Sequence, residues 1–229
     1  MSVILPEIVI QDALRIYLNI VRKDWNDVAP TNQTEEQSTL LYKILGSSII
    51  DNNYDLFEQA KTVIIDTKES DDPRHLQIFL SYDNSDTKYP SVHITLPSED
   101  VGPVDALSWG ENDYDDNPAD EDTVYTKTFN RSFQARYNVL IISDNRNELA
   151  LLYHFIKSGL ISLQPHLMLS GLRNLKISGG DMRWNPQVPP GVFNRVLSMM
   201  FYYDVNAPDL DSTPSIGAVS YIQKTVENL

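Results

Sequence analysis

The sequence contains no cysteine among its 229 residues. This absence excludes disulfides, zinc–thiolate sites, iron–sulfur clusters and cysteine nucleophiles. Long hydrophobic runs are also missing, because the most apolar stretch, residues 192–205, is interrupted by Asn194, Arg195 and Asp204. A bilayer span needs roughly 20 apolar residues, so we expect no transmembrane helix. Residues 1–6 carry no basic side chain, and we expect no secretory signal there.

Basic clusters are the third absence. The chain has 18 Lys and Arg against 32 Asp and Glu, which gives a formal net charge of −14. Neutralisation of phosphates by basic side chains supplies most of the non-specific affinity for nucleic acid. We therefore expect no specific nucleic-acid binding and no membrane association.

The negative charge is concentrated in one central segment, residues 99–126. This segment has no basic side chain, and its acidic residues are Glu99, Asp100, Asp105, Glu111, Asp113, Asp115, Asp116, Asp120, Glu121 and Asp122. Such a run repels itself, which predicts an exposed loop inserted into the domain. Residues 127–229 carry a small basic excess instead.

Helical patterns come first along the chain and define an N-terminal helical part, residues 1–60. Residues 6–23 have an amphipathic period, with Pro6 in the first turn. Residues 34–37 form a capping-box pattern that predicts a second helix, with its buried face at Leu40, Leu41, Ile44 and Leu45. A short helix is predicted at residues 54–60.

Strand patterns follow, separated by one helix. Glu148 to Leu163 predicts a long helix with Asp144 as its N-cap. Gly179-Gly180 is expected to break the strand before it. The predicted strands are residues 62–66, 75–80, 91–96, 124–129, 133–142, 171–178, 193–204 and 218–226. This order predicts a single α+β domain, residues 1–229, in which one long helix packs on a mostly antiparallel sheet.

The sequence offers little for catalysis. It has no G-x-S-x-G elbow and no glycine-rich phosphate loop. His154 and His166 are better explained as helix-side and helix-exit residues than as catalytic bases. His75 and His93 lie on neighbouring predicted strands and could face each other, but no third metal ligand can be placed beside them. We expect no catalytic residue, no cofactor and no metal.

The acidic segment allows a calcium hypothesis, since carboxylates are natural calcium ligands. Asp113, Asp115 and Asn117 match the start of an EF-hand loop, but Pro118 and Val124 occupy the positions of its glycine and bidentate glutamate. A looser calcium site would use Asp113, Asp115, Asp120 and Asp122. Two alternatives therefore stay open: a small soluble metal-dependent hydrolase, and a calcium-stabilised structural module.

Two aromatic features bear on contact surfaces. Trp109 stands alone in the acidic segment, where it either marks a contact surface or anchors its own loop, and neither reading is favoured. The run from Ser198 to Tyr203 is rich in methionine and aromatic residues. For this strand we favour core packing over an interface.

The order of elements in the second half resembles the tail-terminator and neck proteins of tailed bacteriophages. The resemblance rests on the strand Phe133–Asp144, the helix start Glu148–Tyr153, residues 169–181, residues 192–195 and the Phe201-Tyr202-Tyr203 strand. It covers residues 40–226 and is strongest over 130–205. The long acidic insertion departs from the compact members of that group.

The resemblance implies a structural virion protein located at the neck or tail junction. Such a protein forms a homo-oligomeric ring, a hexamer or a dodecamer, between the head connector and the tail tube. It has no catalytic site, and DNA passes through its lumen. The charge distribution adds that the acidic segment of one copy pairs with basic residues of the next. The candidate interface residues are Trp109, Asp113, Asp115, Asp116, Arg131, Arg136, Arg173, Arg183 and Arg195.

Overall fold

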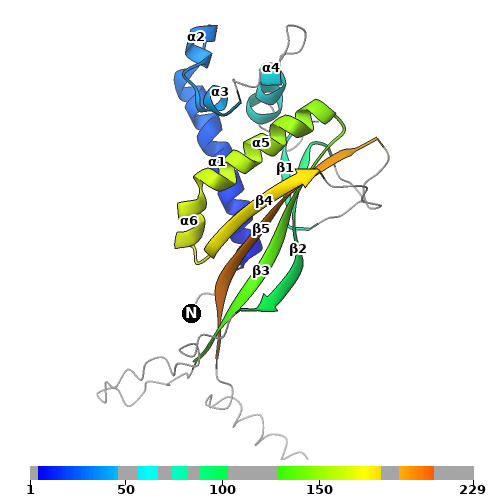
Figure 1. The fold of residues 1–229 in the computed structure, drawn as a ribbon. Coiled ribbons are helices and arrows are strands. Elements are labelled where there is room, and N and C mark those ends of the chain that lie inside the picture. Colours follow the sequence, from blue (N-terminus) through cyan, green and yellow to red (C-terminus); the bar gives the residue numbers. More distant parts are fainter. Residues whose placement is uncertain are drawn as a thin grey trace, which may run out of the picture.

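The computed structural model places a group of helices on one face of a five-stranded sheet (Figure 1). It describes residues 5–45, 56–66, 74–81, 88–102, 128–181 and 191–208. The predicted α+β class and the mostly antiparallel sheet are confirmed.

The sheet has the strand order β1-β2-β3-β5-β4. Its strands are β1 (Gln77–Phe79), β2 (Ser91–Val101), β3 (Thr128–Ser143), β4 (Arg173–Asp181) and β5 (Phe193–Pro208). β1 pairs with β2 in parallel, and the other three pairings are antiparallel. β3 and β5, 16 residues each, pair along their whole length. Their lower ends project beyond the helices (Figure 1).

β2, β3, β4 and β5 are longer than the sequence predicts, whereas β1 is shorter than the predicted strand 75–80. Residues 128–143 form one continuous strand, whereas the sequence predicts two. Gly179-Gly180 does not break β4, which runs on to Asp181. Glu99 and Asp100 belong to β2 and pair with β3, so the acidic loop does not begin at residue 99. The predicted strand at 218–226 lies outside the described residues.

Six helices are described: α1 (Pro6–Val28), α2 (Gln33–Glu36), α3 (Leu40–Leu45), α4 (Leu56–Lys61), α5 (Arg146–Ser162) and α6 (Gln164–Leu169). α1 starts at Pro6, where the missing N–H costs nothing. It continues past residue 23 because Trp25 still reaches the core. None of the helices in the described part of the chain is long and apolar enough to cross a membrane.

The helix caps differ from those predicted. The capping interactions lie two residues earlier: the Asn32 Oδ1 accepts from the Glu35 N–H at 3.1 Å, and the Glu35 carboxylate accepts from the N–H of Thr31, the residue before the cap, at 2.7 Å. For α5 the cap is Asn145, not Asp144. In both places the sequence offers adjacent capping residues, and only the backbone geometry selects between them.

The predicted strand at residues 62–66 is wrong. Thr62–Asp66 continues α4 as a π-helical turn, η2. The side chains of Val63, Ile64 and Ile65 are all buried, and the Arg22 Nε donates to the Ile64 carbonyl at 2.7 Å. Packing against α1 therefore overrides the strand preference of these β-branched residues.

One hydrophobic core joins the N-terminal helices to the sheet. The sheet contributes alternate residues of its strands, which is the period-2 pattern of a face in contact with helices. The largest fully buried side chains include Phe155 of α5 and Phe201 of β5. The predicted core role of the Ser198–Tyr203 strand is confirmed for Met199, Phe201 and Tyr203.

Candidate interaction surface on the sheet

The two faces of the sheet have different environments. One face, here called the covered face, packs against α1 and α5. Its residues on the two central strands are Ala135, Tyr137, Val139, Ile141, Leu197, Met199, Phe201 and Tyr203. The opposite face, here called the open face, consists of Gln134, Arg136, Asn138, Lys176, Ser178, Ser198, Met200 and Tyr202. These residues are exposed or half-buried, whereas Leu140 and Ile142, at the upper end of the same face, are buried.

Cations lie in a row across the open face. The strand register places Arg136 of β3 opposite Met200 of β5, and Met200 opposite Lys176 of β4. Both cations are exposed. The Gln134 Nε2 donates to the Met200 sulfur at 3.0 Å. One cation therefore lies on each side of the Met200 thioether. Such a surface suits a carboxylate-bearing partner.

A third cation, Arg173, flanks this row. It lies opposite Tyr202 in the β4–β5 register. Its Nη2 contacts the Asp204 carboxylate at 2.5 Å and donates to the Ser132 hydroxyl at 3.2 Å. Both charged side chains are exposed, so water screens the pair and it stabilises the fold little. Its effect is to hold the guanidinium along the sheet.

The structure brings together two of the predicted interface residues, Arg136 and Arg173. Arg195 lies on the other face, where its Nε contacts Asp181 at 2.7 Å and its guanidinium lies 5.3 Å from the Tyr153 ring centroid. Arg131 has the strand parity of the covered face and lies opposite Val205, near the projecting end. Trp109, Asp113, Asp115, Asp116 and Arg183 lie outside the described residues, as does the possible calcium site that would add Asp120 and Asp122.

Sequence reasoning missed Lys176. The alternation of exposed and buried residues along β4 would have placed it on the outer face. Its alignment with Arg136 depends on the register of three strands, including a shift between Arg173 and Lys176. No local sequence signal reports that register.

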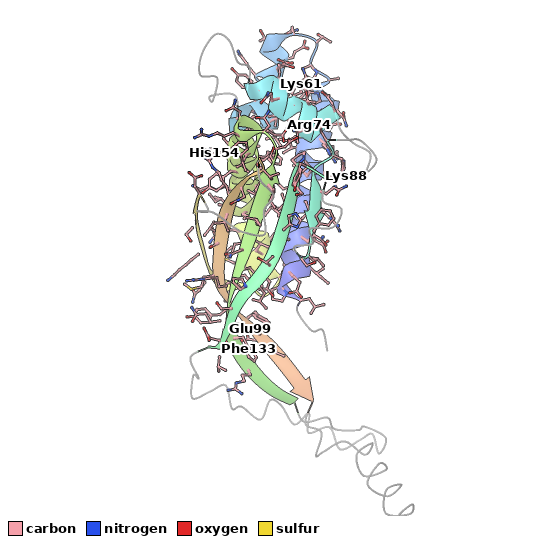
Figure 2. The ribbon with its side chains drawn as sticks, turned by 90° about the vertical axis from the view of Figure 1, so that its right-hand side faces the viewer. Lys61, Arg74, Lys88, Glu99, Phe133 and His154 are labelled. Carbon is pink, nitrogen blue, oxygen red and sulfur yellow. The ribbon has the colours of Figure 1, made fainter. Side chains whose placement is uncertain are left out.

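The lower end of the covered face holds two tyrosine–carboxylate pairs. The Tyr137 hydroxyl donates to the Glu7 carboxylate at 2.8 Å, and the Tyr203 hydroxyl donates to Glu99. Burial raises the pKa of Tyr137 and of Tyr203, and the carboxylate partners raise it further. Both tyrosines are therefore neutral donors: Tyr137 joins α1 to the sheet, and Tyr203 joins β5 to β2. Figure 2 shows Glu99 and Phe133 at this end, far from Lys61 and Arg74.

A serine–histidine pair lies at the upper end of the sheet. The Ser91 Oγ is 3.0 Å from the His93 Nε2, and the His93 Nδ1 is 2.9 Å from the Ser81 carbonyl oxygen. That carbonyl only accepts, so Nδ1 carries the proton and the hydroxyl donates to Nε2. Ser91 is 0% exposed and His93 is 1% exposed. The pair therefore satisfies buried polar groups and is closed to a substrate.

The histidine pair does not form as suggested. The register partner of His93 is Phe79, whose ring stacks on the imidazole at a centroid distance of 5.1 Å, and His75 precedes β1. Burial lowers the pKa of His93, against the opposing effect of the Ser81 carbonyl. Over the described ranges, no three His, Asp or Glu side chains gather as metal ligands do.

A partly buried ion pair closes the upper end of the core, with the Glu148 side chain 5% exposed and the Arg74 side chain 35% exposed. The Glu148 carboxylate is 2.6 Å from the Arg74 Nη2 and accepts from the Ser143 hydroxyl at 2.6 Å. Arg74 also contacts Asp144 at 3.1 Å. These contacts tie residue 74, in the segment before β1, to the start of α5. Glu148 therefore has a structural partner that its place in the first helical turn does not reveal.

Comparisons with known proteins assign no family. No protein-family model matches the sequence, and no curated protein matches it.

Proposed function

We propose that this protein is a structural subunit of a tailed-phage virion, a tail terminator or neck protein that assembles into a ring between head connector and tail tube. The observation that carries the proposal is the sheet with one covered face and one open face bearing the Arg136–Met200–Lys176 row. The element order of the second half, which resembles that family, supplies the virion context. The role is structural, without catalysis or cofactor.

Ring assembly requires two different surfaces on each copy that fit each other. The open face supplies one, with cations at Arg136, Lys176 and Arg173. The acidic segment that follows β2 supplies the other, because residues 102–126 hold eight carboxylates and no basic side chain. In the proposed ring, the acidic segment of one copy lies against the open face of the next.

Charge complementarity also suits a soluble subunit that assembles late. Paired charges steer association and select the partner, while the free surfaces stay hydrated before assembly. The excess of carboxylates leaves a negative ring that DNA can pass without adhering. Neighbouring connector and tail-tube proteins would bind the two ends of the ring.

The direct test is the particle formed by the full-length chain. Light scattering after size exclusion, with negative-stain electron microscopy, should show a closed ring of six or twelve copies. A chain that stays monomeric at all accessible concentrations and salt conditions would contradict the proposal. A chelator should change neither particle mass nor melting temperature, whereas a calcium-dependent melting shift would favour a calcium-stabilised module instead.

The pairing of charges has its own test. Replacing Asp113, Asp115, Asp116 and Asp120 by asparagine keeps the length of the acidic segment and removes four charges. We expect assembly to weaken by at least about tenfold at low salt and to lose most of its salt dependence. Assembly with unchanged strength and unchanged salt dependence would reject the pairing.

A further inference from the structure

β4 forms one edge of the sheet. It pairs with β5 on one side, and no strand in the described part of the chain pairs with its other side. Natural edge strands are usually blocked by proline, by lysine or other charges, by bulges or by a cover. β4 has one bulge, between Arg173 and Lys176 near its start. From Leu175 to Gly180, β4 has no proline and one charged residue, Lys176. Its unpaired backbone groups can therefore accept another strand.

The sequence supplies a predicted strand that lies outside the described residues. Residues 218–226, Ala-Val-Ser-Tyr-Ile-Gln-Lys-Thr-Val, have the alternation and the β-branched content of a strand. They follow β5, which ends at Pro208 on the projecting end of the sheet. In the sequence, residues 209–217 lie between Pro208 and this segment.

The number of residues between Pro208 and Ala218 limits antiparallel pairing of this segment with β4. An antiparallel partner of β4 begins beside Asp181, which lies opposite Arg195 of β5. From Pro208 the chain must return along β5 as far as Arg195, about 43 Å at ~3.3 Å per residue. The step from residue 208 to residue 218 spans at most about 36 Å when fully extended. The β4 edge of its own sheet is therefore out of reach for full antiparallel pairing.

We propose that residues 218–226 of one copy add as an antiparallel strand to the free edge of β4 in the next copy. The contact is heterologous, since the donated strand and the accepting edge are different surfaces, so it propagates around a ring. Backbone hydrogen bonds supply the affinity. This inference rests on the proposed self-assembly and names the contact that performs it.

A proline substitution in the full-length chain tests the donated strand. Ile222→Pro removes a backbone donor and disfavours strand pairing, whereas Ile222→Thr, the matched control, keeps the donor and a β-branched side chain. We expect Ile222→Pro to weaken assembly by at least about tenfold and Ile222→Thr to retain it. Both should keep the urea midpoint of the monomer, because the described core ends before residue 209. Equal assembly of the two variants would overturn the proposal.

The absence of cysteine makes a crosslinking test clean. Ser178→Cys protein is mixed under mild oxidation with each of Ser220→Cys, Tyr221→Cys and Ile222→Cys, in a chain of different tag length. We expect a disulfide between unlike chains in at least one mixture, because adjacent strands bring Cα atoms within bonding range. Lys157→Cys, on α5, replaces Ser178→Cys as the control and should give none.

The outcomes separate the two proposals. Rings without any such disulfide would overturn strand donation and leave the ring subunit standing. A disulfide that forms within one chain carrying both cysteines, and never between chains, would also overturn it. A wild-type chain that never assembles would remove both proposals.

Discussion

The covered and open faces of one sheet show how alternate residues of the same strands serve different purposes. Phe201 is fully buried against the helices, while its neighbour Tyr202 faces outward beside Arg173. The covered face is apolar and its tyrosine hydroxyls have carboxylate partners. The open face is polar and carries the cations Arg136 and Lys176. The first set holds the fold together, and the second carries the contacts of the proposed ring.

The largest contrast is expected from large-to-small substitution of neighbouring aromatics. Phe201→Ala removes a fully buried ring and leaves a cavity, which should lower the free energy of unfolding by about 3–5 kcal/mol. Tyr202→Ala, one residue on, should cost about 1 kcal/mol or less because the ring is half-exposed. Urea unfolding followed by circular dichroism measures both. Equal losses would mean that the two faces are not distinct.

Two adjacent glycines allow the two faces to be compared by adding a methyl group instead of removing a side chain. A Cβ at Gly179 would lie 2.5 Å from the Tyr153 hydroxyl and 2.8 Å from the Val196 carbonyl oxygen, whereas a Cβ at Gly180 meets nothing within 4 Å. Gly179→Ala should therefore cost about 1–3 kcal/mol by overpacking. Gly180→Ala should be neutral or slightly stabilising.

Thermal or urea unfolding of the two alanine variants provides the check. A Gly179→Ala protein with the free energy of unfolding of the wild type would show that α5 does not pack against β4 as closely as the distances imply.

These pairs also show what could be predicted from the sequence. The alternation from Phe133 to Ile142 and the period of residues 148–163 were sufficient to predict a sheet with a helix against it. The methionine- and aromatic-rich run Ser198–Tyr203 predicted core packing, which is confirmed for Phe201. Caps were misplaced because Asn32 and Asn145 stand beside other capping residues. Residues 62–66 were predicted as a strand because the tertiary contact with Arg22 is invisible in the sequence.

The candidate surface was harder to predict than the fold. Arg136 and Arg173 were singled out by charge, but charge also singled out Arg195, which lies on the covered side beside Tyr153. The odd or even position of a residue along its strand assigns it to a face of the sheet only when the register with the neighbouring strands is known. Lys176 joined the surface through that register alone.

The open face is not uniform, and pH provides a smaller test of its upper end. There Ser91, His93, Leu140 and Ile142 are buried. Burial lowers the pKa of His93 below its ordinary value of 6.5, so the unfolded chain takes up the proton at higher pH than the folded chain. The contribution of His93 to the free energy of unfolding is therefore fully present above pH 6.5, and it declines as the pH falls below that value.

We therefore expect the urea midpoint to fall between pH 7 and pH 5, and His93→Gln to flatten that slope. His154→Gln is the matched control, because its exposed ring should contribute less. A slope that is identical in wild type and His93→Gln would show that the buried imidazole does not control this pH dependence.

The most direct measurement of the central claim is the particle mass of a charge-reversed open face. Arg136→Glu combined with Lys176→Glu reverses the cation row without touching the core, and Lys157→Glu is a charge-matched control for one reversal on α5. Light scattering should show that the double variant stays monomeric at concentrations where wild type and Lys157→Glu form rings. Rings of unchanged mass and unchanged salt dependence in the double variant would contradict the account.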